Sequence, residues 1–355
     1  MRNLIDITDL TTDELQGIMD VACDIIAHPD DYSERCRGKI LATLFFEPST
    51  RTRLSFEAAM CDLGGKVIGF SDAGNSSTVK GESLADTARV IGSYVSIIAM
   101  RHPKDGAAYL ASRYAGVPLI NAGDGGHCHP TQTLADMLTI YRAKGGFDKL
   151  TVGFCGDLKY GRTVHSLLAA LARYGGVKVV LISPEQLKLP DYIKTGLMAE
   201  AGMPYKEVDS LEDAIPDLDV LYMTRIQRER FLNDTAYADL EDKYMLTAAK
   251  MALAKDDCIV LHPLPRVTEI DVDVDPDPRA KYFEQVSNGK VMRMALILFL
   301  LSHLNDDAPN PSFEDRGLRC GNHRCVANEE RSIVPLFKKT RDGKLVCAYC
   351  EAEVK

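Results

Sequence analysis

The sequence predicts an α/β protein with two doubly wound parallel-sheet domains and a small C-terminal zinc domain held by four cysteines. Apolar, strand-like runs alternate along the chain with amphipathic stretches of helical period, which is typical of a parallel sheet covered by helices. The alternation starts again near residue 150, and four of the ten cysteines lie close to the C-terminus. A chain of 355 residues is long enough for two or three such domains.

The first half of the chain begins with a helix and continues as an alternation of strands and helices. Thr11 and Glu14 have the spacing of a capping box, in which each side chain binds the backbone N–H of the other residue, so a helix is expected to start there. The remaining elements follow from hydrophobic periodicity. Strands are expected at residues 40–46, 66–70, 96–100 and 118–122, and helices at residues 52–63, 82–94 and 107–114.

The same pattern restarts after an expected helix at residues 134–143, which would link the two domains. Two successive α/β domains place ligand binding at the carboxyl ends of the strands, in the cleft between the domains. The acidic run at residues 269–277 is expected to be a solvated loop. Strands are expected at residues 150–155, 177–183, 220–223 and 258–262, and helices at residues 163–174 and near 187–201.

The domain limits follow from these elements and from composition. The first domain is expected to span residues 1–130 and to be completed by a helix at 290–304, and the second domain to span residues 131–289. The apolar run at residues 295–301 is too short to cross a bilayer and is expected to be a buried helix. Residues 305–317, rich in Asn, Asp and Pro, are a linker by composition, and residues 318–355 form the zinc domain.

Composition and charge narrow the class of function. The net charge of -9 argues against general binding of nucleic acid, although a local basic pocket could still bind an anionic substrate. No signal-peptide core follows Met1, and no apolar run is long enough for a membrane span. We therefore expect a cytoplasmic enzyme that acts on small molecules and binds neither nucleic acid nor a membrane.

The segment at residues 46–53 joins an expected strand to an expected helix and is a candidate phosphate site. A helix N-terminus presents unpaired backbone N–H groups and the positive end of the helix dipole. Ser49, Thr50 and Thr52 add hydroxyl donors, and Arg51 adds a forked cation that suits phosphate oxygens. A helix cap alone would need one hydroxyl, so three hydroxyls and an arginine favour phosphate binding over simple capping.

Four cysteines near the C-terminus, in Cys320-x4-Cys325 and Cys347-x2-Cys350, have the spacing of a structural zinc site. A reducing compartment keeps thiols free, so these pairs indicate metal ligands before disulfides. Four thiolates complete a tetrahedral site without a water, and His323 is a further candidate that the site does not need. We expect one structural zinc per chain, which would fold a module too small to build its own core, and no organic cofactor.

Several of these segments resemble motifs of the carbamoyltransferase family, and they follow one another in the order that the family has. Residues 49–52, Ser-Thr-Arg-Thr, resemble its carbamoyl phosphate signature, and residues 76–83 resemble its mobile loop. Residues 100–103, Met-Arg-His-Pro, and residues 129–133, His-Pro-Thr-Gln-Thr, resemble two further substrate motifs. The match extends from near residue 1 to about residue 305 and implies a carbamoyltransferase-like fold for this part of the chain.

The resemblance implies a role for each residue of the first site. Arg101 would bridge the phosphate and the carbonyl oxygen, His129 would donate a hydrogen bond to that oxygen, and Gln132 would orient the carbamoyl amide. Ser76 and Lys80 would enter the active site of a neighbouring subunit, so that a homotrimer with shared sites is the smallest active unit. The implied catalytic residues are Arg51, Thr52, Lys80, Arg101, His129 and Gln132. The implied contacts of carbamoyl phosphate are Ser49, Thr50, Arg51, Thr52, Ser76, Lys80, Arg101, His129, Gln132, Pro263 and Leu264.

The second domain resembles the aspartate-specific branch of the family. Arg162 matches an arginine that binds the α-carboxylate of aspartate, and Arg225 matches one that binds the β-carboxylate. Two arginines suit two carboxylates, whereas an ornithine site would need acidic groups for the side-chain ammonium. His-Pro-Leu-Pro-Arg at residues 262–266 is the aspartate-specific form of its motif, because the ornithine form has a cysteine at the first proline. The implied contacts of aspartate are Lys80, Arg162, Arg225 and Gln227.

The resemblance implies transfer of the carbamoyl group of carbamoyl phosphate to the amino group of L-aspartate, an early step of de novo pyrimidine biosynthesis. Glu47 and Arg230 match residues that brace the two domains, although either could be a surface ion pair of little worth. The cysteine spacing resembles the zinc domain of the separate regulatory chain found with some aspartate-specific members. Without the nucleotide-binding domain of that chain, we expect the fused domain to stabilise assembly and to carry no CTP or ATP site.

Three other interpretations stay open from the sequence. Residues 156–163 nearly match the phosphate-binding loop of nucleotide triphosphatases, but Arg162 replaces its lysine, and Lys159 and Tyr160 make the loop bulky. The chain could also be a carbamoyltransferase for another amino acid, or an inactive scaffold that carries zinc. Turnover measurements with different substrates would separate these interpretations.

Overall fold

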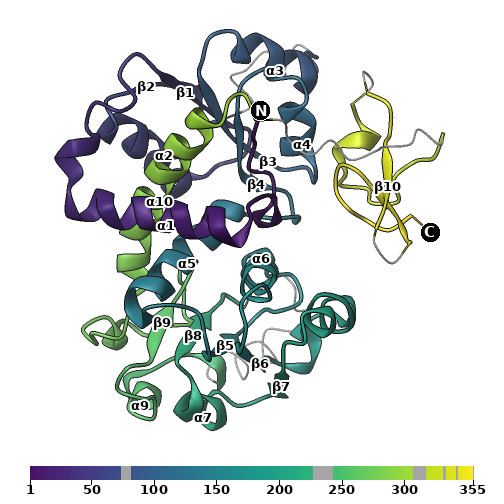
Figure 1. The fold of residues 1–355 in the computed structure, drawn as a ribbon. Coiled ribbons are helices and arrows are strands. Elements are labelled where there is room, and N and C mark those ends of the chain that lie inside the picture. Colours follow the sequence, from purple (N-terminus) through teal and green to yellow (C-terminus); the bar gives the residue numbers. More distant parts are fainter. Residues whose placement is uncertain (73–80, 227–242, 307–316, 331–332, 341–342, 355) are drawn as a thin grey trace. The chain divides into compact units, whose positions relative to one another are not determined.

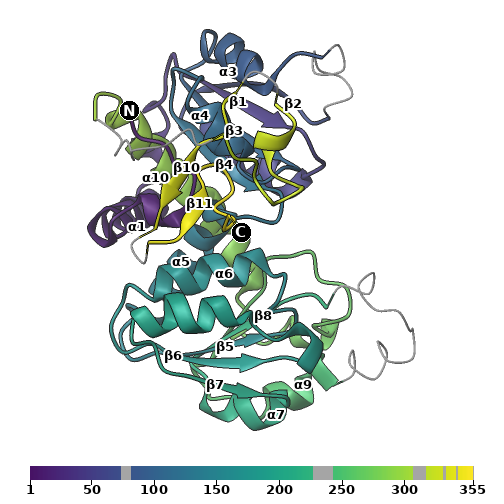
Figure 2. The same ribbon diagram turned by 90° about the vertical axis from the view of Figure 1, so that its right-hand side faces the viewer.

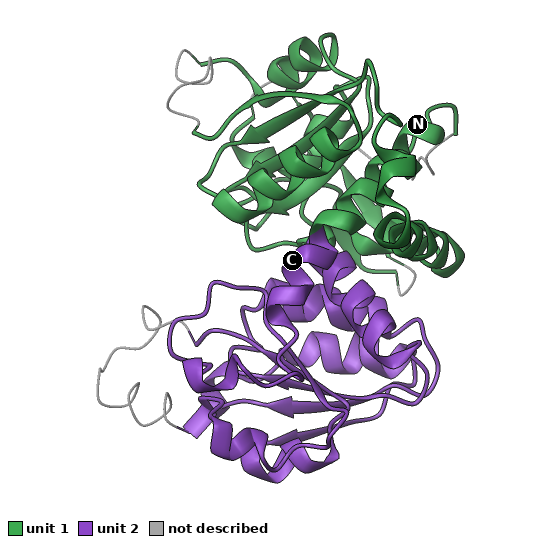
Figure 3. Ribbon diagram, turned by 90° about the vertical axis from the view of Figure 1, so that its left-hand side faces the viewer, with its two compact units in different colours: residues 1–131, 290–355 green, residues 132–289 purple. Residues whose placement is uncertain are grey.

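The computed structural model describes residues 1–72, 81–226, 243–306, 317–330, 333–340 and 343–354 of the chain. The chain divides into two compact units, which Figure 3 colours separately. Unit 1 contains residues 1–131 and 290–355, and unit 2 contains residues 132–289. Each unit has its own parallel sheet with helices, so the predicted α/β class with two parallel-sheet domains is confirmed.

The sheet of unit 1 has four parallel strands in the order β2-β1-β3-β4. All four predicted strands form, and their ends lie within two residues of the predicted limits. The central strands are apolar and buried because helices cover both faces of a parallel sheet, whereas the edge strand β2 is largely exposed. The strands are β1 (Ile40–Phe45), β2 (Lys66–Phe70), β3 (Ile97–His102) and β4 (Leu119–Asp124).

The helices of unit 1 lie close to their predicted positions (Figure 1). α1 begins with the predicted capping box, because Thr11 Oγ1 accepts from Glu14 N at 3.1 Å and Glu14 Oε2 accepts from Thr11 N at 2.8 Å. α2 begins directly after the loop that follows β1, which places its N-terminus at the carboxyl edge of the sheet. The helices are α1 (Thr12–Ala27), α2 (Thr50–Asp62), α3 (Leu84–Gly92) and α4 (Ala107–Ser112), with short 3-10 helices η1 (Ile7–Asp9) and η2 (Pro29–Tyr32).

The sheet of unit 2 has five parallel strands in the order β7-β6-β5-β8-β9, of which Figure 2 labels β5 to β8. Four of them were predicted, but β7 was missed. Its sequence, Tyr-Lys-Glu-Val, has few apolar residues because this edge strand is mostly exposed. The strands are β5 (Thr151–Cys155), β6 (Lys178–Ile182), β7 (Tyr205–Val208), β8 (Val220–Met223) and β9 (Ile259–Leu261).

The helices of unit 2 include one that differs from the prediction. The helix expected near residues 187–201 starts later, since Pro190 can be accommodated only at a helix start, and its core is the π-helix η6. The others connect the strands as the alternation predicted. The helical segments are α5 (Pro130–Lys144), α6 (Arg162–Leu171), η5 (Glu185–Leu187), η6 (Ile193–Met198), α7 (Leu211–Ala214), η7 (Ile215–Asp217), α9 (Ala248–Met251), η9 (Val272–Val274) and α10 (Tyr282–Ser302).

Helices α5 and α10 each contribute residues to both units, because the units divide within these helices. In unit 2, the buried carboxylate of Asp136 on α5 accepts from Gln285 of α10 at 2.5 Å and from the Tyr222 hydroxyl of β8 at 3.0 Å. The apolar run 295–301 lies in α10 and is largely buried. None of the helices in the described ranges is long and apolar enough to cross a lipid bilayer.

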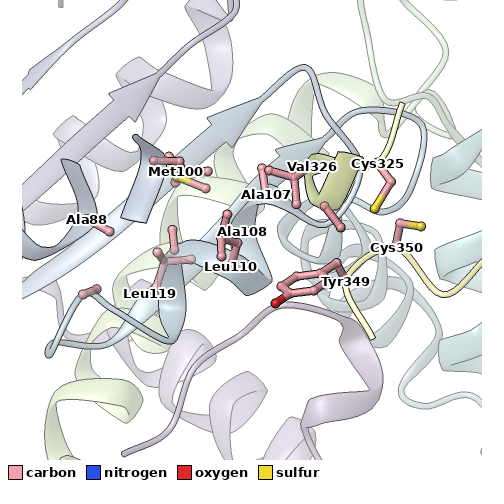
Figure 4. Close-up of a cluster of buried hydrophobic side chains, with 14 of the residues drawn as sticks. Ala88, Met100, Ala107, Ala108, Leu110, Leu119, Cys325, Val326, Tyr349 and Cys350 are labelled. Atoms are coloured by element: carbon pink, nitrogen blue, oxygen red, sulfur yellow. The ribbon is translucent and has the colours of Figure 1, made fainter. Parts of the chain in front are cut away.

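The C-terminal module, residues 318–355, belongs to unit 1. Its antiparallel strands β10 (Phe337–Lys339) and β11 (Leu345–Cys347) follow the short helix η10 (Val326–Asn328). The module and α4 share one apolar core, and Figure 4 shows Val326 and Tyr349 beside Ala107 and Ala108. The rings of Tyr109 and Tyr349 also meet edge to face at 5.9 Å. The module therefore packs on the helix that follows β3.

Candidate active site and metal centre

The loop after β1 and the end of β3 lie next to each other at the carboxyl edge of the first sheet. Phe45 pairs in register with Arg101, and the backbone N–H of Phe46 donates to the Arg101 carbonyl at 2.9 Å. The loop then leads into Ser49 and the first turn of α2. This arrangement brings the predicted phosphate-binding segment and Arg101 together within unit 1.

The N-terminus of α2 has the features of an anion site more than those of a self-capped helix. Ser49 occupies the N-cap position, but its side chain makes no capping hydrogen bond. No acidic residue lies in the first turn, so no side-chain carboxylate there offsets the positive end of the dipole. Thr50, Arg51 and Thr52 form this first turn, and their N–H groups have no partner inside the helix. An anion at this end would be stabilised by both effects.

Arg101 is held by an acidic neighbour and lies close to Arg51. Its Nε donates to Glu47 Oε1 at 2.6 Å, and both side chains are partly buried. Partial burial lowers the pKa of Arg51, and the positive charge of Arg101 lowers it further. Two guanidinium groups that repel each other gain stability when a dianion binds between them.

His129 lies beside Arg101, and a glycine makes room for both. An ideal β-carbon on Gly123, at the end of β4, would lie 3.3 Å from Arg101 Nη1 and 3.4 Å from His129 Cδ2. His129 is buried, immediately precedes α5, and has its Nδ1 3.5 Å from Thr131 Oγ1. Sequence reasoning missed Gly123, whose only signal is its place between a strand and the His-Pro-Thr-Gln motif.

Gln132 lies on the first turn of α5, three residues after His129. Its Nε2 donates to Asp136 Oδ1 at 2.8 Å, and the same Asp136 oxygen accepts from Gln285. This bond fixes the direction of the carboxamide and leaves its oxygen as the acceptor for other groups. An accepting oxygen is what the expected contact with a carbamoyl NH₂ requires.

In unit 2, the carboxyl ends of the neighbouring strands β5 and β8 carry the two predicted carboxylate-binding arginines. The strands stay paired to their ends, where Thr224 N and Thr224 Oγ1 donate to the Cys155 carbonyl at 2.8 and 3.0 Å. Arg225 follows directly, and Arg162 opens α6 after the loop that leaves β5. Both arginines are partly buried at the same edge of the sheet.

The loop at residues 156–161 does not suit a nucleotide phosphate. A phosphate-binding loop turns its backbone N–H groups toward the anion. Here the N–H of Tyr160 donates to the side chain of Asp157 at 3.0 Å, and Asp157 is fully buried inside the loop. A buried carboxylate at this point repels phosphate, which disfavours the nucleotide triphosphatase interpretation.

The His-Pro-Leu-Pro segment after β9 is held in an uncommon backbone conformation. Leu264 has a left-handed φ of 50°, and the Leu264–Pro265 peptide is cis. The N–H of Leu264 donates to His262 Nδ1 at 2.7 Å, while His262 Nε2 lies 2.8 Å from Glu269 Oε1. A bulky residue with positive φ persists only where its surroundings fix it, so this pair of contacts holds the carbonyls of Pro263 and Leu264 in place.

Glu269 corrects the expectation of a solvated acidic loop at residues 269–277. Its side chain is buried, and it also accepts from the backbone N–H groups of Val267 and Thr268 at 3.0 and 3.1 Å. Burial alone would raise the pKa of Glu269, but the bond to His262 and the backbone donors hold it below its ordinary value. Asp275 is likewise engaged, by Arg266. These partners become adjacent only on folding.

Three predicted site residues, Ser76, Lys80 and Gln227, lie outside the described residues, as does Arg230. The described site residues therefore form two groups. Ser49, Thr50, Arg51, Thr52, Arg101 and His129 belong to unit 1, and Gln132, Arg162, Arg225, Pro263 and Leu264 belong to unit 2.

The four C-terminal cysteines form the predicted metal centre, with one sulfur each from Cys320, Cys325, Cys347 and Cys350. All four are buried, and their sulfur atoms lie within 4.8 Å of one another. Two sulfur pairs are 3.5 and 3.8 Å apart, close to the edge of roughly 3.8 Å expected for a tetrahedron of Zn–S bonds. His323 is exposed and does not join this group.

Three family models match the chain. Residues 2–142 match the carbamoyl-P binding domain of aspartate/ornithine carbamoyltransferase, and residues 148–300 match its Asp/Orn binding domain. Residues 314–355 match the metal binding domain of the aspartate carbamoyltransferase regulatory chain. Together these matches account for most of the chain.

Curated relatives and solved structures agree with the family models. The chain is 59% identical over 302 residues to an aspartate carbamoyltransferase catalytic subunit of Lachnoclostridium phytofermentans, covering 85% of this chain and 98% of that one. It is 60% identical over 300 residues to that of Finegoldia magna, covering 84% and 98%. The catalytic subunit of M. jannaschii aspartate transcarbamoylase superposes with a TM-score of 0.81 at 47% identity, covering 86% and 100%. The Trypanosoma cruzi aspartate transcarbamoylase in complex with N-(phosphonacetyl)-L-aspartic acid superposes with a TM-score of 0.78 at 39% identity, covering 84% of this chain and 95% of that one.

Proposed function

This chain belongs to the aspartate/ornithine carbamoyltransferase family and acts as an aspartate carbamoyltransferase, and from that premise we propose which of its residues perform the reaction. The reaction transfers the carbamoyl group of carbamoyl phosphate to the amino group of L-aspartate. It yields N-carbamoyl-L-aspartate and phosphate, and we assign it to an early step of de novo pyrimidine biosynthesis. The observation that carries the assignment of residues is the meeting of Arg101 and His129 at Gly123.

In the proposed mechanism, the N-terminus of α2 holds the phosphate through Ser49, Thr50, Arg51 and Thr52. Arg101, oriented by its 2.6 Å bond to Glu47, contacts both the phosphate and the carbonyl oxygen. No covalent intermediate with the enzyme is needed, because carbamoyl phosphate is already activated. The catalytic effect is therefore mainly electrostatic, with donors fixed in advance around the developing charge.

His129 donates to the carbonyl oxygen, which gains negative charge as the amine attacks. Gln132 accepts from the carbamoyl NH₂ through the oxygen that its bond to Asp136 leaves available. The backbone carbonyls of Pro263 and Leu264 accept from the same NH₂ and from the incoming amine. The left-handed backbone at Leu264 supports this role, because it holds the carbonyls in a fixed direction.

Aspartate binding is assigned to two forked guanidinium groups. Arg162 takes the α-carboxylate and Arg225 takes the β-carboxylate, with Gln227 in support. Their places after the adjacent strands β5 and β8 favour joint action on one small dicarboxylate. Ornithine, whose side chain ends in an ammonium, would be repelled by Arg225.

The test measures carbamoyl transfer to aspartate and, in parallel, to ornithine. We expect turnover with aspartate only, and a fall of about 100-fold or more in kcat/KM for both Arg51→Ala and Arg225→Ala. Arg53→Ala is the matched control, since Arg53 shares the first turns of α2 but faces Glu57 at 3.5 Å. Turnover with ornithine would contradict the roles of Arg162 and Arg225. No turnover by the wild-type protein would favour an inactive scaffold.

We assign the metal of the C-terminal module as one structural zinc per chain, and no organic cofactor is required. The four thiolates leave no open position, so the metal would supply folding energy to the module and no chemistry to the reaction. We keep the predicted domain limits. The carbamoyl phosphate-binding domain comprises residues 1–130 and the helix at 290–304, and the aspartate-binding domain comprises residues 131–289. Residues 305–317 are the linker, and residues 318–355 are the zinc domain. A cytoplasmic location agrees with ten cysteines of which none forms a disulfide.

Ser76 and Lys80 are assigned to a loop that enters the site of a neighbouring subunit, with Lys80 contacting both substrates. Arg51 and Arg101 would then meet a third cation from a second chain around the phosphate. The smallest active assembly would be a homotrimer with shared sites. The module would stabilise that assembly, and no binding of nucleic acid or membrane is assigned.

A further inference from the structure

The end of β4 and the loop that follows it contain a buried cluster, centred on Asp124 and His127, that the proposed mechanism does not use. Asp124 is fully buried, and its Oδ2 accepts from the backbone N–H of Gly106 at 2.9 Å. The same oxygen lies 3.1 Å from Nδ1 of His127. Asn121 Nδ2 donates to the other oxygen at 2.9 Å. The carboxylate is thus fixed from three sides and fixes His127 in turn.

The second nitrogen of the His127 ring faces the C-terminal module. Nε2 lies 3.8 Å from Glu351 Oε2, and the His127 side chain is only 15% exposed. Glu351 is 51% exposed, so this contact contributes little to stability. Its effect is on the orientation of the ring, because each of the two ring nitrogens of His127 faces a carboxylate, Asp124 or Glu351.

The backbone of the module supports this reading of Glu351. Glu351 has a left-handed φ of 60°, which is uncommon for a residue that is not glycine. Such a conformation costs energy and persists where the surroundings fix it. The residue follows the metal ligand Cys350, and Lys338 also binds its carboxylate, at 2.5 Å. The backbone conformation of Glu351 and its bond to Lys338 therefore hold the carboxylate where its Oε2 faces His127.

A second contact reaches the same cluster through Gly106. A β-carbon on Gly106 would lie 2.4 Å from the backbone carbonyl oxygen of Tyr349, so the module touches the peptide that donates to Asp124. The module thus approaches the cluster from two directions. The loop ends at His129, two residues after His127.

We propose that His127 is a positioning residue for His129, held at one ring nitrogen by Asp124 and at the other by Glu351 of the C-terminal module. The inference rests on the role proposed for His129 at the carbonyl oxygen. A loop that can shift would move His129 away from the developing charge, and a displacement of about 1 Å can cost about 100-fold in rate. This loss of rate should appear in kcat, because the hydrogen bond from His129 to the carbonyl oxygen becomes stronger in the transition state than in the bound substrate.

The experiment compares four variants of the full chain. Asparagine can replace Nδ1 of histidine as a donor, so His127→Asn keeps the contact with Asp124 and loses the one with Glu351. His127→Ala loses both. We expect kcat to fall by about 10-fold or more in His127→Ala and less in His127→Asn, with KM for aspartate nearly unchanged. Glu351→Ala should resemble His127→Asn, and Glu353→Ala is the control on the same segment.

A double-mutant cycle separates positioning from general damage. If Glu351 acts through His127, Glu351→Ala should lower kcat in the wild-type background and add nothing in His127→Ala. Equal, additive losses would overturn the proposal, as would a wild-type kcat in His127→Ala. Amide hydrogen exchange at residues 125–129 is a readout that does not depend on turnover. We expect faster exchange at these residues in Glu351→Ala and in His127→Ala. Unchanged exchange would overturn the proposal, and this result does not depend on which reaction the enzyme catalyses.

Metal analysis excludes one other explanation of the cluster. The ligand atoms of Asp124, His127 and Cys128 lie within 4.8 Å of one another, a spacing that a cation could also bridge. Positioning requires one metal per chain in the wild-type protein and in His127→Ala. Two metals per chain, falling to one in His127→Ala, would overturn the positioning role in favour of a cation site.

Discussion

At the scale of single residues, Gly123 leaves the space in which Arg101 and His129 approach each other. Its φ of +118° is unfavourable for any other residue, and an added β-carbon would press on both side chains at 3.3–3.4 Å. We expect Gly123→Ala to lower kcat by about 10- to 100-fold, because it would displace the two groups that we propose to contact the carbonyl oxygen. The free energy of unfolding should fall by about 1–3 kcal/mol from backbone strain.

The matched control for Gly123→Ala is Gly38→Ala. Gly38 also has a left-handed φ of +80°, but no atom lies within 4 Å of an added β-carbon. It should therefore lose stability by a similar amount and keep its kcat. Steady-state kinetics and urea denaturation of both variants measure the two effects separately. A Gly123→Ala enzyme that turned over like Gly38→Ala would mean that Arg101 and His129 do not act together.

His102, next to Arg101, should make stability depend on pH. Burial, together with the nearby charge of Lys104, lowers the pKa of His102 to about 4. Between the ordinary value of 6.5 and about 4, the unfolded chain binds a proton that the folded chain does not. The free energy of unfolding should thus fall as the pH drops through this window, by up to about 3 kcal/mol.

The variant His102→Asn tests this dependence. Asparagine can still accept from Lys104 N, as His102 Nδ1 does at 3.1 Å, but it does not titrate. We expect a flatter loss of stability between pH 6.5 and 4, measured by urea denaturation. His28→Asn is the control, since His28 is an exposed surface residue whose pairing with Asp24 contributes little. Parallel pH profiles for wild type and His102→Asn would contradict the assignment.

From the sequence, a site residue could be predicted only where it has a functional group and belongs to a recognisable motif. Ser49 to Thr52 stand out because hydroxyls and an arginine cluster before a helix. Gly123 does not, because a glycine contributes space and no functional group. Glu269 was placed in solvent because its partner His262 lies seven residues away, on the far side of a loop that only folding closes.

At the scale of elements, strands inside a sheet were easier to predict than strands at its edge. β1, β3, β5 and β8 are apolar runs because helices cover both of their faces. β7 pairs with β6 along its whole length, yet it is mostly exposed and has no such run. Its position is set by hydrogen bonds to β6, which periodicity cannot detect.

The two helices that contribute to both units, α5 and α10, were predicted shorter than they are. α5 begins at Pro130, directly after His129, because proline suits the first turn of a helix. α10 begins at Tyr282, where polar residues obscure the apolar run that predicted it. Their extra turns carry Gln132 and Gln285, both of which bind Asp136. The buried carboxylate thereby joins a proposed substrate contact to the packing of two long helices.

At the scale of the whole molecule, the C-terminal module extends the apolar core of unit 1. Its core is continuous with that of α4, so the metal centre and the loops after β3 and β4 belong to one folded unit. A module of this size has too little apolar core to fold alone, so we expect it to depend on a bound metal and on its packing against α4. Removal of the metal should therefore change the position of the loop that ends at His129.

The last prediction concerns the assembly, in which Lys80 of one chain would act in the site of another. Lys80→Ala and His129→Ala should each be inactive alone, because each removes a group from every site. If sites are shared, a trimer that contains both kinds of chain has one site with neither substitution. Chains mixed in equal amounts and allowed to exchange should then regain about a quarter of wild-type activity. Sedimentation should give three chains per particle. A mixed sample that stayed inactive while exchange was demonstrated would place Lys80 in the site of its own chain.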